Sequence, residues 1–218
     1  GVLTVVTGVA GSGKSSLINQ VFLAQHPEAI VIDQSPVGVS TRSNPATYTG
    51  VMDDIRKAFA NANKVSASLF SFNSQGACEN CQGLGVILTD LGSLDVVKTP
   101  CEICGGKRFM KETLEVKFKK KSIYDVLKMT VEEGLTFFED IPAVHDRLKT
   151  LNDVGLGYLE LGQSANTLSG GEAQRIRLAS QIGAGLMGVM YVLDEPSIGL
   201  HQRDNDRLLQ TLIRLRDL

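Results

Sequence analysis

Residues 8 to 15 read Gly8-Val9-Ala10-Gly11-Ser12-Gly13-Lys14-Ser15, which fits the phosphate-loop pattern GxxxxGK followed by Ser or Thr. They follow an apolar run, Val2 to Val6, that predicts a buried strand. The glycines let the backbone curl so that successive amides point at phosphate oxygens, and the helix expected from about Lys14 adds the positive end of its dipole. An ordinary glycine-rich turn between a strand and a helix is the alternative. The pattern predicts a nucleoside triphosphate site.

Two side chains of this loop have specific expected roles. Lys14 is expected to neutralise the β- and γ-phosphates, and Ser15 to ligate Mg²⁺. The residues of the loop that are predicted to bind the nucleotide are Gly8, Gly11, Ser12, Gly13, Lys14, Ser15 and Ser16.

The composition is that of a globular chain. With 218 residues and 43% hydrophobic composition, it is long enough for one large domain, or for one domain with an insertion, around a packed core. The formal net charge of −2 argues against a protein that coats nucleic acid by global charge, so any DNA contact must come from a local patch. Because the sequence shows neither an apolar stretch of bilayer length nor a signal peptide, the cytoplasm is the predicted compartment, without membrane contact.

Four cysteines form two CxxC pairs, Cys78 with Cys81 and Cys101 with Cys104, separated by nineteen residues. Each pair lies in a glycine-containing turn, where backbone amides can approach the sulfurs. Four thiolates with no neighbouring histidine favour tetrahedral Zn²⁺ in a closed, structural site. Two disulfides are the alternative, which the reducing compartment expected for this chain disfavours. The metal is expected to hold a small knuckle whose own core is too thin to fold.

A second motif, Leu168-Ser169-Gly170-Gly171-Glu172, matches the LSGGQ or LSGGE signature of ATP-binding-cassette (ABC) proteins and precedes a helical run from Ala173 to Gln181. Ser169 and Glu172 also fit an S-x-x-E capping box, so the simpler interpretation is a well-capped helix. Both interpretations hold together, because a capped helix N-terminus with bare glycine amides is itself an anion site. The residues expected to meet the γ-phosphate of a nucleotide held elsewhere are Ser169, Gly170 and Gly171.

Another apolar strand, predicted from Met190 to Leu193, ends in the carboxylates Asp194 and Glu195. Asp194 is expected to position Mg²⁺ through its coordinated water, and Glu195 to polarise the attacking water as general base. Gln34 ends a further predicted strand, Ala29 to Asp33, where ABC ATPases carry a glutamine that senses Mg²⁺ and the γ-phosphate. An exposed strand-end glutamine without a role is the alternative for this position.

Together these motifs resemble the UvrA family, the ATPases that recognise damaged DNA in bacterial nucleotide excision repair, and their shorter relatives. The resemblance covers nearly the whole chain. The segments similar to the second cassette of the family include the CxxC pairs and residues 32–38, 43–50, 130–133 and 153–163. By contrast, the stretch that begins with residues 181–186 and ends with residues 196–204 resembles the first cassette. The chain is therefore similar to a mosaic, or to the shorter UvrA-like group associated with antibiotic-resistance clusters.

The resemblance implies an ABC-type ATPase that couples ATP binding and hydrolysis, with Mg²⁺ and Zn²⁺, to damaged-DNA recognition. It implies two partners, a second ABC cassette (in a homodimer or in the other half of a longer chain) and double-stranded DNA. The helicase UvrB is a further partner of the family, but the insertion that binds it is missing from the sequence. Because the chain stops at Leu218, before the strand and the switch histidine of the family, it is expected to be C-terminally truncated, with impaired ATP turnover.

Two alternative functions remain open at this point. One is a UvrA-like resistance ATPase that acts on a drug or a transporter. The other is a truncated cassette that binds nucleotide and zinc without turnover.

The expected fold is α/β, a P-loop ABC-type nucleotide-binding domain with an inserted zinc-bearing helical/β signature domain. Residues 1–52 and 162–218 are expected to form the two halves of the ATP-binding core and to close on one sheet. Residues 53–161 form the predicted insertion, with the zinc module at 71–109. Its expected elements are a helix from Asp53 to Ala62, an alternating strand from Thr113 to Lys119, and helices capped by Ser122 and by Thr130 with Glu133.

A basic stretch in this insertion is the candidate DNA surface. If opening and closing of two cassettes moves the insertion across DNA, its cations would grip the backbone. A solvated, lysine-rich strand face is the alternative. The candidates for phosphate contact are Lys107, Arg108, Lys117, Lys119, Lys120 and Lys121.

Overall fold

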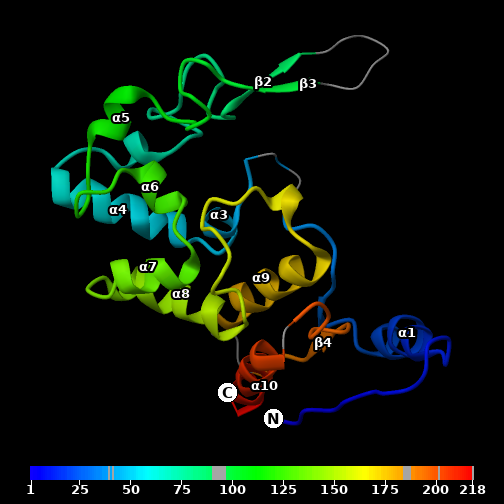
Figure 1. The fold of residues 1–218 in the computed structure, drawn as a ribbon. Coiled ribbons are helices and arrows are strands. Elements are labelled where there is room, and N and C mark those ends of the chain that lie inside the picture. Colours follow the sequence, from blue (N-terminus) through cyan, green and yellow to red (C-terminus); the bar gives the residue numbers. More distant parts are fainter. Residues whose placement is uncertain (39, 41, 90–96, 184–187, 201, 218) are drawn as a thin grey trace.

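The computed structural model describes all residues except 39, 41, 90–96, 184–187, 201 and 218. Its elements form a helical body with two appendages (Figure 1). One appendage carries the hairpin of β2 and β3, and the other carries α1 near the N-terminal segment. The described helices do not include one that is long and apolar enough to cross a membrane.

A small parallel sheet joins the two ends of the sequence. Strand β1 (Ile30–Ile32) pairs in parallel with β4 (Tyr191–Leu193), with Ile30 opposite Tyr191 and Ile32 opposite Leu193. Helix α9 (Gly170–Gly183) packs against β1. Helix α10 (Gln202–Asp217) is the last described element. The expectation that the first and last parts of the chain meet on one sheet is therefore confirmed, and so are the two predicted strands that lead to Gln34 and Asp194.

The strand predicted for Val2 to Val6 is wrong. These residues form no strand, and the side chains of Val2 and Val5 are 90% and 75% exposed. A strand needs a ladder partner and an apolar face to cover it. In the described part of the chain, the sheet of β1 has only one other strand, β4, so the valine run has no such partner.

The helix predicted after the phosphate loop is present but irregular. It consists of α1 (Lys14–Ser16), a π-helical stretch η1 (Leu17–Phe22) and α2 (Leu23–Gln25). None of its residues is buried. The local chemistry of the loop thus starts the helix without the support of a packed face.

Helices form the middle of the molecule and most of its core. They are α3 (Pro45–Tyr48), α4 (Val51–Asn63), η2 (Ala67–Phe70), α5 (Lys111–Glu115), α6 (Ile123–Leu127), α7 (Val131–Phe137), α8 (Pro142–Asp153) and η3 (Ala165–Thr167). Helix α8 packs on α4, α7 and α9, which makes it the centre of this body. The predicted helix at 53–62 is confirmed within α4, and the predicted caps are confirmed as complete capping boxes, Ser122 with Asp125 and Thr130 with Glu133.

The strand predicted from Thr113 to Lys119 is also wrong. Residues Lys111–Glu115 form α5, and the chain then makes a tight turn in which the backbones of Phe118 and Lys121 exchange two hydrogen bonds of 2.9 Å. Phe118 packs on the rings of Phe59 and Phe138, with centroid distances of 5.5 and 5.9 Å. The alternating apolar residues therefore reach a helical core, since no described strand lies beside them.

The predicted zinc module contains an antiparallel hairpin, β2 (Val86–Thr89) with β3 (Val97–Pro100). Residues 90–96, which also fall in the predicted module, lie outside the described residues. The base of the hairpin holds the two cysteine turns, because Cys101 donates its backbone amide to Gly85 at 2.9 Å. Gly85 is required there, since it has φ 78° and a side-chain carbon would lie 2.8 Å from the Gly106 carbonyl oxygen.

Candidate functional site

The phosphate loop curls around its own lysine. The Lys14 ammonium donates to the carbonyl oxygens of Gly8 at 2.8 Å and Val9 at 2.9 Å. Gly11 and Gly13 have φ of 78° and 83°, a conformation that glycine adopts without strain. An added side-chain carbon at Gly8 would meet the Ser12 hydroxyl at 2.8 Å. The loop is exposed and cationic at its centre, which suits a phosphate group.

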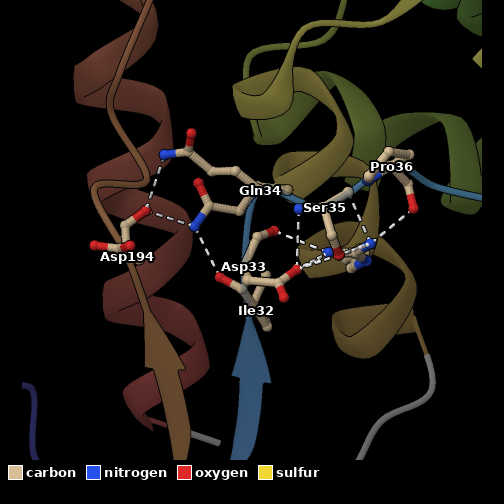
Figure 2. A network of polar contacts seen from close by, with 8 residues as sticks. Ile32, Asp33, Gln34, Ser35, Pro36 and Asp194 are labelled. Atoms are coloured by element: carbon tan, nitrogen blue, oxygen red, sulfur yellow. Dashed lines mark hydrogen bonds and ion pairs between the residues drawn. The ribbon is translucent and has the colours of Figure 1, made fainter. Parts of the chain in front are cut away.

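The Gln34 side chain reaches across to the neighbouring strand at the same end of the sheet. Its amide donates to the Asp194 carbonyl oxygen at 3.4 Å, although 160 positions separate the two residues in sequence. Figure 2 shows residues 32–36 beside Asp194 at the ends of the two parallel strands. Two of the three predicted catalytic residues are therefore brought together by the pairing of β1 with β4.

Glu195, the third predicted catalytic residue, directly follows Asp194. Its φ is 45°, a left-handed conformation that is uncommon for a residue with a side chain. Its carbonyl oxygen accepts the Ile198 amide at 3.1 Å, so the chain turns sharply where the strand ends. Both carboxylates are exposed. Strained backbone of this kind gathers at functional sites, where it directs a side chain away from the strand.

The predicted signature forms a complete capping box at the start of α9. The Glu172 carboxylate accepts from the Ser169 amide at 2.7 Å, and the Ser169 hydroxyl accepts from the Glu172 amide at 3.3 Å. Tyr158 adds a hydrogen bond of 2.7 Å to the same carboxylate. Burial raises the pKa of Glu172, but the hydrogen bonds from Ser169 and Tyr158 outweigh it and hold that pKa below 4.5. The glutamate therefore stays ionised at neutral pH.

A Glu172→Ala variant is expected to lose about 1 kcal/mol of stability at neutral pH, because the first turn of α9 loses its cap. The lowered pKa means that this contribution is present above pH 4.5 and is lost as the pH falls through the folded-state value. Urea unfolding of wild type and variant at neutral and acidic pH measures the difference. The Glu132→Ala variant, which changes an exposed glutamate in the first turn of α7, is the control. If wild type and Glu172→Ala still differed in stability by the same amount at acidic pH, the expectation would be contradicted.

The signature and the Gln34 segment enclose one hollow. A cavity of about 260 Å³ is lined by residues of both, including Gln34, Ser40, Ser169 and Gly170. Gly170 itself lies so close that an added side-chain carbon would be 3.1 Å from the Gln34 Cβ. A side chain at this point of the signature would therefore crowd Gln34.

Two residues of α9 that the sequence analysis missed attach this helix to the strand ends. The Gln174 amide donates to Ile32 and Asp194, and the Arg177 guanidinium contacts Asp33, Ser35 and Pro36. A polar residue on the buried side of α9, where Ala173, Ile176 and Leu178 lie, is the signal that marks Gln174. For Arg177, the sequence around it gives no comparable signal.

The four cysteines lie together in the way the sequence predicts. Their sulfur atoms all lie within 4.8 Å of one another, with Cys78 3.9 Å from Cys101 and Cys81 3.7 Å from Cys104. Tetrahedral Zn²⁺ with bonds of 2.3 Å places its sulfurs about 3.8 Å apart, so the ligand set fits this ion. All four side chains are free thiols.

Polar neighbours and burial act on these thiols in opposite directions. The Asn80 amide donates to the Cys101 sulfur at 3.2 Å, and this bond, with backbone amides of the turn, lowers the pKa of Cys101 to about 6. Burial raises the pKa of Cys104 to about 12. Cys101 therefore offers a ready thiolate, whereas burial disfavours the ionised form of Cys81 and Cys104.

Some of the side chains that are candidates for DNA contact are already bonded within the protein, and others are exposed. The Arg108 guanidinium lies 3.8 Å from the centre of the Phe72 ring and donates to Gly83 at 2.8 Å, so it belongs to the knuckle. Burial lowers the pKa of Arg108 to about 10. Lys119 donates to Phe137 and pairs with Asp140. Lys107, Lys117, Lys120 and Lys121 are exposed.

Comparisons with known proteins agree with these observations. No protein-family model matches the chain. It is 50% identical over 244 residues to UvrABC system protein A of Staphylococcus epidermidis, which covers 98% of this chain and 26% of the relative. It is 51% identical over 247 residues to UvrABC system protein A of Bacillus subtilis, which covers 100% of this chain and 26% of that relative.

Among solved structures, the crystal structure of UvrA2 from Deinococcus radiodurans matches with a TM-score of 0.82 and 46% identity, over 96% of this chain and 29% of that chain. The chain thus spans about a quarter of the length of the curated relatives, each covered to 26%. The structural likeness indicates the fold of an ABC ATPase with a zinc module. Over the length it spans, the chain belongs to the UvrA family.

Proposed function

We propose that this chain is an ATP-binding cassette of a UvrA-type ATPase, which couples ATP binding and hydrolysis to recognition of damaged DNA in nucleotide excision repair. The observation that carries the proposal is the contact of Gln34 with Asp194 at 3.4 Å. This bond joins Gln34 to the backbone of Asp194 where β1 and β4 end, and it supports a shared magnesium site for the two residues in a chain that is 50% identical to UvrABC system protein A.

The residues of the site divide the work of holding Mg·ATP. The amides of the phosphate loop and the Lys14 ammonium would bind the phosphates, with the hydroxyls of Ser15 and Ser16 beside them. Asp194 and Gln34 would orient the magnesium ion through its water, and the ion would neutralise charge on the phosphates. Glu195 would accept the proton of the attacking water.

The proposed domains follow the same division. Residues 1–52 and 162–218 supply the ATP-binding core, and residues 53–161 supply the signature domain with its zinc module at 71–109. Ser169, Gly170 and Gly171 would complete the nucleotide site of a second cassette, so ATP would act as a link between two cassettes. Zinc would be held by the four thiolates in a structural role. UvrB would be a partner of a longer assembly.

The Lys14→Ala variant tests the nucleotide site. Loss of a charge-assisted contact to phosphate is expected to weaken Mg·ATP binding by about tenfold to a hundredfold. Isothermal titration calorimetry of the wild-type chain and the variant measures the change. Lys57→Ala, which removes an exposed lysine paired with Asp54 on α4, is the matched control. Equal heats for Lys14→Ala and wild type, or no heat for wild type, would refute the site.

Replacing Lys120 and Lys121 by alanine tests the DNA surface. If both side chains contact phosphates, the slope of log Kd against log salt for duplex DNA should fall by about two. The measurement is a fluorescence-anisotropy titration of a labelled duplex at several salt concentrations. Lys149→Ala, which removes a lysine paired with Asp153 on α8, is the control for loss of charge alone. An unchanged slope would exclude these two lysines as DNA contacts.

A further inference from the structure

Gln174 joins the ends of the two strands that carry the proposed catalytic groups. Its side chain is buried, with the residue 1% exposed. Its amide nitrogen donates to the carbonyl oxygen of Ile32 at 2.8 Å and to that of Asp194 at 2.7 Å. Ile32 is the last residue of β1, and Asp194 directly follows β4. A single NH₂ group therefore fixes the separation of the strands where their ladder stops.

Arg177, one helical turn further along α9, holds the segment on both sides of Gln34. It pairs with the Asp33 carboxylate and donates to the carbonyl oxygens of Asp33 at 2.9 Å, Ser35 at 2.8 Å and Pro36 at 2.9 Å. Asp33 also accepts the Ser35 amide at 3.1 Å and the Ser35 hydroxyl at 2.6 Å, so the turn is closed internally. Hydrogen bonds from Ser35, with the charge of Arg177, hold the pKa of Asp33 below its usual range.

These contacts depend on an arginine, because the planar guanidinium holds five donors in a fixed geometry that the ammonium group of a lysine does not have. The Arg177 side chain is 18% exposed, so water competes little for its partners. Asp33 and Ser35, the neighbours of Gln34, are thus bonded to α9, so the backbone on both sides of Gln34 is held in place. Figure 2 shows this network around residues 32–36 and Asp194.

The same helix begins with the signature. Gly170 approaches Gln34 so closely that an added side-chain carbon would lie 3.1 Å from its Cβ and 3.2 Å from its carbonyl oxygen. The first turn of α9 therefore touches Gln34 directly, and the next turns hold Asp33, Ser35 and Asp194. The signature and the side chains that hold the strand ends therefore belong to one continuous helix.

Resting on the proposed ATPase function, we propose that Arg177 and Gln174 are positioning residues that hold Gln34 beside Asp194. Through them, the geometry of this cassette's own magnesium site depends on the position of α9. A nucleotide of a second cassette that engages the signature then adjusts Gln34 in this cassette. The two nucleotide sites of a cassette pair are coupled along α9.

The Arg177→Ala variant tests this coupling in the whole chain. Because the phosphate loop still holds ATP, the Kd for Mg·ATP is expected to stay within about twofold of wild type, while kcat falls about tenfold to a hundredfold through misplacement of Gln34. Arg177→Lys should recover only part of kcat. Arg177 is the better choice than Gln174, since replacing the buried Gln174 would also disturb the core. An unchanged kcat in Arg177→Ala overturns the inference.

A double-mutant cycle with Gln34→Ala shows whether Arg177 acts through Gln34. If it does, adding Arg177→Ala to Gln34→Ala lowers kcat no further, because the group to be positioned is already gone. Independent losses that multiply in the double variant overturn the inference. So does a large effect of Arg177→Ala beside a Gln34→Ala variant that turns over ATP like wild type.

Hydrogen exchange provides a readout that needs no turnover. In nucleotide-free protein, Arg177→Ala should speed exchange of the Ser35 amide, which donates to the Asp33 carboxylate at 3.1 Å in wild type. Arg214→Ala, which removes a 74% exposed arginine of α10, is the matched control and should leave this exchange unchanged. Unchanged exchange in Arg177→Ala overturns the inference. Absence of Mg·ATP binding by the wild-type chain refutes the proposed function, and the exchange measurement, made without nucleotide, then decides the inference by itself.

Discussion

Glu195→Gln is expected to hydrolyse ATP at least about a hundredfold more slowly than wild type while binding Mg·ATP with similar affinity. A glutamine keeps the size of the side chain but cannot accept the proton of the attacking water. The exposed Glu195 carboxylate lies two residues after β4, on a residue whose φ of 45° turns the chain away from the strand. Because Asp194, Gln34 and Lys14 remain in place, the phosphates and the metal keep their proposed ligands.

Phosphate release at saturating Mg·ATP gives kcat for this variant, and calorimetry gives its Kd. Glu139→Gln, a change at an exposed glutamate in the turn after α7, is the control for loss of one carboxylate. Equal turnover by Glu195→Gln and wild type would exclude Glu195 as the general base. A matched loss of binding would instead assign it to holding the nucleotide.

Cys101→Ser is expected to release zinc and unfold the knuckle at residues 71–109, while the helical body stays folded. Binding of structural zinc contributes about 10–16 kcal/mol in small metal-binding modules. The apolar support around the cysteines is small, since the partly buried side chains packed on this cluster are Leu84 and Ile87. The other buried rings of the module, Phe72 and Phe109, lie in the core that the helical body shares, so little apolar support near the cysteines could replace the metal. The core of α4, α7, α8 and α9 does not include the cysteines.

Three measurements on Cys101→Ser follow this loss: metal content by mass spectrometry, the sites of limited proteolysis, and helix content by circular dichroism. Ile103→Ser is a control in the same turn, because Ile103 is 76% exposed and its replacement leaves all four thiols. New cleavage within 71–109 with retained helix content is the expected result. Full zinc content and unchanged cleavage in Cys101→Ser would contradict a structural zinc site.

Motifs of local backbone chemistry were predicted well from the sequence. The capping boxes of α6, α7 and α9 need only a hydroxyl and a carboxylate three residues apart, and all three form. The two CxxC turns likewise carry their ligand geometry within a few residues. The loop around Lys14 depends on glycines that accept positive φ, and the structure shows this conformation at Gly11 and Gly13. Short spacing made these predictions reliable.

The predictions of strands were wrong where the neighbouring strand had to be assumed. Val2 to Val6 and Thr113 to Lys119 have the apolar patterns of strands, but a pattern does not supply a neighbouring ladder. In the described structure the first run lies exposed and the second begins as helix α5. The basic stretch shows the same limit, because the sequence could not tell that Arg108 stacks on Phe72 and that Lys119 pairs with Asp140.

The sequence by itself determined the chemical groups of this protein: the phosphate loop, the signature, the carboxylate pair and the four thiols. Only the tertiary structure decided which of them meet, because Gln34 and Asp194 are 160 positions apart and come together through the pairing of β1 with β4. It also revealed Gln174 and Arg177, whose partners lie as many as 144 positions away. A hydrogen bond needs only closeness in space, and closeness over such separations is created by packing, which no local pattern records.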